Sequence, residues 1–194
     1  MTEQNKTVLP STEELEAELE RVKYNTRYHR VLKNTIYTLI TVAAVAVLIS
    51  TMWLPVLQIY GSSMTPTVEA GNIVVTMKHT DLKSGDIIAF YYNNKILVKR
   101  VIAEAGEWVE LDETGQVFID GKELQEDYLV EPAYGDTNIK MPYQVPDGKL
   151  FVMGDHRETS LDSRNTAVGC VSQEQIIGKI VFRVWPLDSA GTIQ

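Results

Sequence analysis

With 194 residues, the chain has room for one moderate domain and an additional segment. Its net charge of −8 argues against nucleic acid as the main partner, because phosphate binding needs a basic surface. The single cysteine, Cys170, excludes an internal disulfide and a multi-cysteine metal site, and three histidines in unrelated contexts disfavour a zinc site.

The first 33 residues predict a cytoplasmic segment with a short amphipathic helix. Residues 1–10 have the composition of a disordered end, and Ser11 with Glu14 forms a capping-box pattern. Apolar residues then recur at helical spacing at Leu15, Leu19 and Val22. This helix is either a solvated spacer or a weak self-association face.

A long uncharged stretch follows and predicts a membrane anchor over residues 34–60. It is long enough for one crossing of about 20 residues, and Pro55 marks a helix end or a kink. Basic residues at 21–33 precede it, so the positive-inside rule places the amino terminus in the cytoplasm and everything after residue 60 outside. A buried soluble helix is rarely apolar all round at this length, and a cleavable signal peptide has a shorter core nearer the start.

Residues 61–194 predict an extracytoplasmic domain, so the expected fold is mainly β with one amino-terminal transmembrane helix. Short apolar runs separated by turn signals are typical of an all-β sandwich or barrel. The expected strands are residues 72–77, 86–92, 96–103, 108–111, 116–119, 150–153 and 176–184. Residues 125–148 contain three prolines and no clear period, and predict an irregular insertion.

Two residues in this domain suggest nucleophilic chemistry. Ser63 lies in a stretch of glycine, hydroxyl residues and proline directly after the anchor, but a serine needs a neighbouring base to become a nucleophile. Lys99 lies on a strand that is apolar on both faces. Burial there would lower its pKa and leave a neutral amine, as a general base requires. Separately, the two patterns also fit a linker and a lysine that extends to water.

A dense polar cluster at residues 153–164 is the third feature. It fits a solvated surface loop, but Asp162 and Arg164 are spaced to form a bidentate pair that fixes the loop. Ser160 is then placed to exchange a hydrogen bond with another site group, such as the Lys99 amine.

Together, these segments resemble type I signal peptidases of bacteria, especially the small, single-anchor form of Gram-positive species. The resemblance runs from about residue 35 to 187 and rests on three motifs in order after the anchor, Gly-Ser-Ser-Met-Thr-Pro-Thr, Val-Lys-Arg-Val and Met-Gly-Asp-His-Arg-Glu-Thr-Ser-Leu-Asp-Ser-Arg. It implies that Ser63 is the nucleophile and Lys99 the general base. It also implies that Ser160 orients the lysine and that Asp162 and Arg164 support the site.

The chain departs from the family pattern at two positions. Some members carry a hydroxyl two residues before the nucleophile that helps to hold the oxyanion, and here Gly61 stands there, with Ser62 adjacent rather than equivalent. The second oxyanion donor is therefore left open. His156 stands where asparagine is common.

The resemblance implies a serine endopeptidase with a Ser63/Lys99 dyad that removes signal peptides from exported preproteins at the outer face of the membrane. Such a dyad needs no metal or organic cofactor. The substrates would have small residues at the first and third positions before the cut. Two alternatives are a self-cleaving repressor, which the anchor and acidic charge disfavour, and a non-catalytic anchored β-domain that binds partners.

Overall fold

The computed structural model describes residues 11–78 and 80–193. The disorder predicted for residues 1–10 concerns a segment outside these described residues. The chain divides into two compact units, residues 1–49 and residues 50–194.

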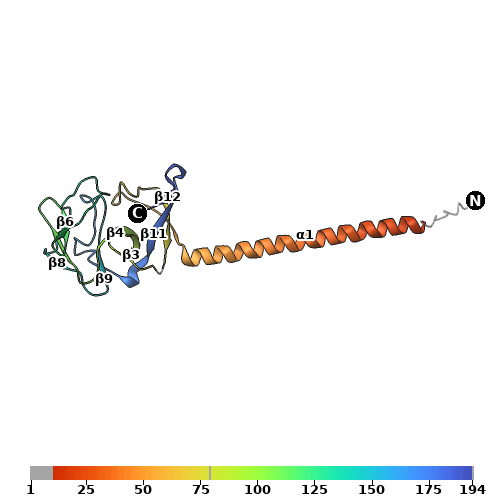
Figure 1. The fold of residues 1–194 in the computed structure, drawn as a ribbon, viewed down its shortest axis with the longest axis horizontal. Coiled ribbons are helices and arrows are strands. Elements are labelled where there is room, and N and C mark those ends of the chain that lie inside the picture. Colours follow the sequence, from red (N-terminus) through yellow and green to blue (C-terminus); the bar gives the residue numbers. More distant parts are fainter. Residues whose placement is uncertain (1–10, 79, 194) are drawn as a thin grey trace, which may run out of the picture. The chain divides into compact units, whose positions relative to one another are not determined.

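The amino-terminal part forms one continuous helix, α1 (Thr12–Trp53), of 42 residues, which spans about 63 Å (Figure 1). The predicted capping box begins it, because the Glu14 N–H donates to the Ser11 hydroxyl at 3.3 Å and the Ser11 N–H donates to the Glu14 carboxylate at 3.0 Å. The short helix and the anchor expected as separate segments are therefore one helix. No glycine or proline lies between residues 11 and 53 to interrupt it.

α1 includes a stretch that is long and apolar enough to cross a membrane, with a mean hydropathy of 1.8. The hydroxyls of Thr35, Thr38 and Thr41 each donate to the carbonyl four residues earlier at 2.9 Å. These hydroxyls are thus satisfied within the helix, as an apolar surrounding requires.

The helix ends before the predicted boundary at residue 60. It stops at Trp53, and residues 56–58 form strand β1 (Val56–Gln58) instead. Pro55, which cannot donate a helical hydrogen bond, separates the two elements, and its carbonyl accepts from the Thr76 N–H at 2.8 Å. Uncharged composition alone did not distinguish this largely exposed edge strand from membrane-spanning helix.

All seven predicted strands are present, and their ends differ from the prediction by at most one residue. They are β2 (Ile73–Met77), β3 (Ile87–Tyr92), β4 (Lys95–Ala103), β5 (Trp108–Leu111), β6 (Val117–Ile119), β9 (Lys149–Met153) and β11 (Ile176–Trp185). Further short elements were not predicted, because two or three residues show no period: β7 (Lys122–Glu123), β8 (Tyr143–Gln144), β10 (Val171–Ser172), β12 (Gly191–Thr192), and the 3-10 helices η1 (Gln173–Gln175) and η2 (Leu187–Ser189).

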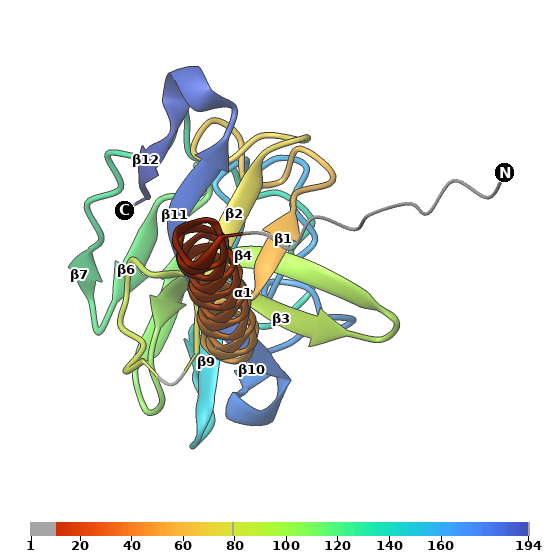
Figure 2. The same ribbon diagram turned by 90° about the vertical axis from the view of Figure 1, so that its right-hand side faces the viewer.

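The strands form two antiparallel sheets, so the mainly β fold is confirmed. The larger, eight-stranded sheet has the order β1-β2-β11-β3-β4-β9-β10, with β12 paired to β11, and the smaller has the order β7-β6-β5-β8. Figure 2 shows β1, β2 and β11 side by side at one end of the larger sheet. The other edge of β1 has no partner strand among the described residues.

Strand β4 positions the residues that matter most. It lies between β3 and β9, with Lys99 opposite Ile88 and Arg100 opposite Met153. Apolar clusters cover both faces, so the two consecutive cations are each only 2% exposed. Because side chains alternate along a strand, Lys99 and Arg100 point to opposite faces.

Candidate active site

Ser63 lies in a turn directly after β1. The next residue, Met64, is buried in an apolar cluster together with Val68, and the Val68 N–H donates to the Met64 carbonyl at 2.9 Å. Gly61 has φ of +89°, a conformation that other residues rarely adopt. The buried neighbours hold the turn and leave Ser63 half-buried.

The side chains of Ser63 and Lys99 meet at this turn. Lys99 Nζ lies 2.5 Å from Ser63 Oγ, within hydrogen-bonding distance. The two residues are 36 positions apart in the sequence. The turn after β1 brings the hydroxyl to β4, whose buried face holds the amine in one place.

Burial controls the protonation of this amine. It lowers the pKa of Lys99 from 10.5 to about 8, because the charged form loses its hydration. Asp162 opposes the shift, Arg164 adds to it, and Asp155 again opposes it. A substantial fraction of Lys99 is therefore neutral near pH 8.

The neighbouring cation, Arg100, is neutralised by Asp155. Its guanidinium donates to both carboxylate oxygens, at 2.9 and 2.8 Å. The Thr67 hydroxyl donates to the same carboxylate at 2.6 Å. Because Thr67 belongs to the segment that follows Ser63, this ion pair ties the Ser63 turn to the polar cluster.

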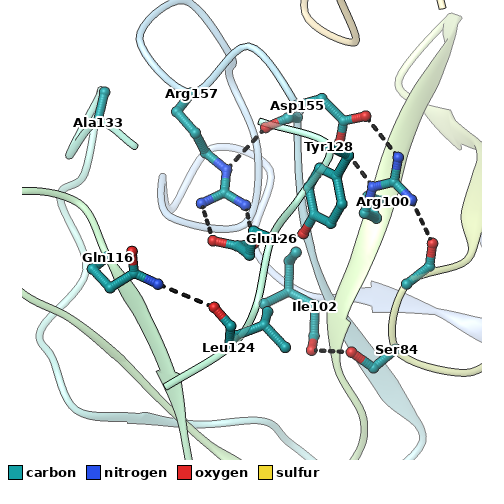
Figure 3. A network of polar contacts seen from close by, with 12 residues as sticks. Ser84, Arg100, Ile102, Gln116, Leu124, Glu126, Tyr128, Ala133, Asp155 and Arg157 are labelled. Atoms are coloured by element: carbon teal, nitrogen blue, oxygen red, sulfur yellow. Dashed lines mark hydrogen bonds and ion pairs between the residues drawn. The ribbon is translucent and has the colours of Figure 1, made fainter. Parts of the chain in front are cut away.

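A second buried ion pair joins the polar cluster to the segment expected to be irregular. Arg157 donates to both carboxylate oxygens of Glu126. The Tyr128 hydroxyl donates to Glu126 at 2.5 Å, and its ring covers the Arg100 guanidinium at 3.8 Å from the ring centre. In Figure 3, the Tyr128 side chain lies between those of Arg157 and Arg100.

The bidentate pair expected between Asp162 and Arg164 is present. Arg164 donates to both Asp162 oxygens at 2.9 Å, and the Gly154 N–H donates to the same carboxylate at 3.0 Å. Arg164 also donates to the carbonyls of Ala133 and Tyr134, at 3.1 and 3.0 Å. The pair therefore fixes both the polar cluster and the 133–134 backbone.

Ser160 differs from the expectation. It is 1% exposed, and its hydroxyl has no hydrogen-bond partner among the residues that the structure describes, so the expected bond to the Lys99 amine is not formed. Its Oγ instead lies against Gly154, 2.3 Å from the position that a Cβ atom there would occupy.

An apolar groove opens beside Ser63. It has a volume of about 500 Å³ and is lined by residues 57–61, 63–64 and 94–98. Gly61 lines the groove, Ser62 does not, and both residues are exposed. An extended peptide placed in this groove would run between β1 and β4 and pass the Ser63 hydroxyl.

The sequence thus identified most of the side chains that meet here, but it missed Thr67, Glu126 and Tyr128. Nothing local marks Glu126 or Tyr128, because their segment has no period and their partners lie about 30 residues away in the chain. The backbone of His156 was missed as well, and its N–H donates to the Ser63 carbonyl at 3.1 Å.

Comparison with known proteins gives a consistent result. The sequence model of the family described as signal peptidase, peptidase S26, matches residues 32–185. The chain is 34% identical over 161 residues to signal peptidase I of Bacillus amyloliquefaciens, a match that covers 77% of this chain and 86% of that protein. It is 33% identical over 146 residues to thylakoidal processing peptidase 1 of Arabidopsis thaliana, covering 66% of this chain and 41% of that longer protein.

A crystal structure of a signal peptidase I from Enterococcus faecalis V583 is similar as well. It is 32% identical, with a TM-score of 0.45, and the match covers 52% of this chain and 97% of that one. The family model spans more than half of the chain, and the bacillus protein exceeds 30% identity over most of both sequences. The chain therefore belongs to the signal peptidase family, peptidase S26.

Proposed function

We propose that this protein is a membrane-anchored serine endopeptidase that removes signal peptides from exported preproteins. One observation carries the proposal: the Lys99 amine lies 2.5 Å from the Ser63 hydroxyl and is 2% exposed. A buried amine with a lowered pKa at this distance is what a serine nucleophile needs as its base.

The reaction begins when neutral Lys99 takes the Ser63 proton and the serine oxygen attacks the scissile carbonyl. The Ser63 backbone N–H stabilises the developing oxyanion. The lysine ammonium then gives its proton to the leaving amine, and an acyl-enzyme remains. Lys99, neutral again, activates the water that releases the signal peptide and regenerates Ser63.

The apolar groove receives the residues before the cut. The unpaired edge of β1 lets an extended substrate add as a strand. A volume of about 500 Å³, with apolar walls and β4 opposite, suits small side chains at the first and third positions before the cut.

The anchor keeps this site at the membrane. Basic residues at 21–33 favour a cytoplasmic amino terminus, and α1 then places the domain that follows it on the outer face. Only three residues separate Trp53, the last residue of α1, from Leu57, the first residue that lines the groove. Exported preproteins present their cleavage sites at this surface.

A processing assay with a purified preprotein tests the dyad. Ser63→Ala and Lys99→Ala should each abolish cleavage, while Ser62→Ala, one position from the nucleophile, should retain it. Circular dichroism establishes that each variant is folded. Near-normal cleavage by a folded Ser63→Ala or Lys99→Ala protein would exclude the dyad.

A further inference from the structure

A second cavity adjoins the nucleophile turn, apart from the apolar groove. It has a volume of about 270 Å³, and its walls include Thr65, Val130, Glu131, Ala133, His156 and Glu158. Thr65 is two residues after Ser63, and the His156 N–H donates to the Ser63 carbonyl. The apolar groove ends at residues 63–64 and shares no lining residue with this cavity. The two spaces are therefore lined by different residues of the turn, the groove by residues 61, 63 and 64 and the cavity by Thr65.

Buried polar contacts hold both walls of this cavity in place. One wall, residues 130–133, is tied down where Arg164 donates to the Ala133 carbonyl at 3.1 Å. The other wall, residues 155–158, is tied down by the buried pairs of Asp155 with Arg100 and of Arg157 with Glu126. Ligand sites are usually formed before the ligand binds. These contacts hold the walls of the cavity in position without a ligand, as such a site requires.

Some of the charged side chains that line the cavity have no counter-charge. Asp155 and Arg157 are each compensated by their buried partners. Glu131 and Glu158 are exposed, and neither forms an ion pair with any of the described residues. The cavity thus presents two uncompensated carboxylates close to the point where a peptide bond would be cut.

We propose that this cavity binds the substrate residues that follow the scissile bond, and that Glu131 and Glu158 make it select a cationic side chain there. The inference rests on the proposed endopeptidase function. A polypeptide whose residues before the cut fill the apolar groove continues beyond Ser63, and the cavity lined by Thr65 adjoins the same turn. A lysine or arginine in that part of the substrate meets opposite charge, whereas an aspartate or glutamate is repelled.

Peptide cleavage by the full chain in detergent measures this selectivity. Three peptides share the residues before the cut and differ only at the second residue after it, which is Lys, Ser or Glu. We expect kcat/KM for the Lys peptide to exceed that for the Glu peptide by about tenfold at low ionic strength, the range of two exposed charge pairs. The ratio should shrink as salt is added, because exposed charges are screened.

The double variant Glu131→Gln/Glu158→Gln should bring this ratio close to one, because neutral amides then replace the two carboxylates. Glu113→Gln is the matched control, since Glu113 is an exposed carboxylate that does not line the cavity, and it should keep the wild-type ratio. A wild-type ratio near one, or a ratio that survives the double substitution, would overturn the proposal.

Peptide binding to the Ser63→Ala variant, which should not cleave, tests the charge preference of the cavity independently of catalysis. The variant should bind a fluorescent Lys peptide more tightly than the Glu peptide, and the three combined substitutions should abolish the difference. If wild-type protein cleaves the peptides without charge preference, the cavity assignment alone fails. If it cleaves none of them, the proposed function fails as well.

Discussion

A Cβ atom on Gly154 would lie 2.4 Å from the Ser63 carbonyl oxygen and 2.3 Å from Ser160 Oγ. Gly154 is therefore a close contact between the polar cluster and the Ser63 turn, beside the hydrogen bond from the His156 N–H to the Ser63 carbonyl. The Gly154 N–H donates a hydrogen bond to Asp162. A shift of residue 154 away from Ser63 would therefore break that hydrogen bond. A side chain at residue 154 would therefore press against the backbone of Ser63.

The first prediction follows from this contact. Gly154→Ala should lower kcat by roughly a hundredfold, because a displacement near 1 Å at the reacting groups has about that effect. Overpacking should also lower the free energy of unfolding by about 1–3 kcal/mol. Gly191→Ala is the control, since nothing lies within 4 Å of a Cβ there. Wild-type kcat in the Gly154→Ala variant would contradict this account of the site.

The second prediction concerns the pH dependence of activity. In the proposed mechanism neutral Lys99 is the base, and its pKa is lowered to about 8, so kcat/KM should fall about tenfold for each pH unit below 8 and level off above it. A peptide substrate without ionisable side chains ensures that the profile reports the enzyme. A flat profile between pH 5 and 9 would argue against a titrating lysine base.

The same buried amine should reduce stability. The pKa of Lys99 is 10.5 when hydrated and about 8 in the fold, so the unfolded chain binds more protons between these values. The free energy of unfolding therefore increases as pH rises from about 8 to 10.5. Below pH 8, the buried Lys99 amine lowers the free energy of unfolding by roughly 3 kcal/mol.

Lys99→Met, which keeps the shape and removes the charge, should accordingly raise the melting temperature at pH 7. The gain should shrink at pH 10.5 and above. Scanning calorimetry of the full chain in detergent at both pH values checks the sign. A lower melting temperature for Lys99→Met at pH 7 would show that the amine is not desolvated.

A further prediction concerns the buried pair between Arg157 and Glu126. Glu126→Gln leaves the guanidinium without its counter-charge, which should cost about 3–5 kcal/mol of stability. Tyr128→Phe keeps the ring over Arg100 and loses one hydrogen bond, which should cost about 1 kcal/mol. Chemical unfolding of the two variants shows which of them loses more free energy of unfolding. Equal, small effects would mean that water, rather than Glu126, satisfies Arg157.

Ser160 gives the last prediction. Its buried hydroxyl lacks a partner among the described residues, so Ser160→Ala should leave the free energy of unfolding unchanged or raise it by about 1 kcal/mol. Thermal unfolding of this variant beside Ser189→Ala, an exposed serine, provides the comparison. A loss of more than 1 kcal/mol would indicate a hydrogen bond that this arrangement does not contain.

Local sequence patterns were enough to predict many of the secondary-structure elements of this protein. Strands such as residues 108–111 and 150–153 were predicted because alternating or continuous apolar runs with turn signals persist over several residues. The helix start at Ser11 was predictable from two side chains that bond across one turn. By contrast, β1 was assigned to the anchor, because a short uncharged segment such as Val-Leu-Gln does not show by its composition whether it is strand or membrane helix.

The sequence by itself determined seven of the strands, the apolar helix and the side chains proposed for the chemistry, since each is marked by residues that are near neighbours in the chain. Only the tertiary structure decided which of those residues meet. The 2.5 Å approach of Lys99 to Ser63 depends on β1 and β4 lying near each other in the fold. The Glu126–Arg157 pair likewise joins residues 31 positions apart. Such contacts arise from packing over the whole domain, and no local period encodes them.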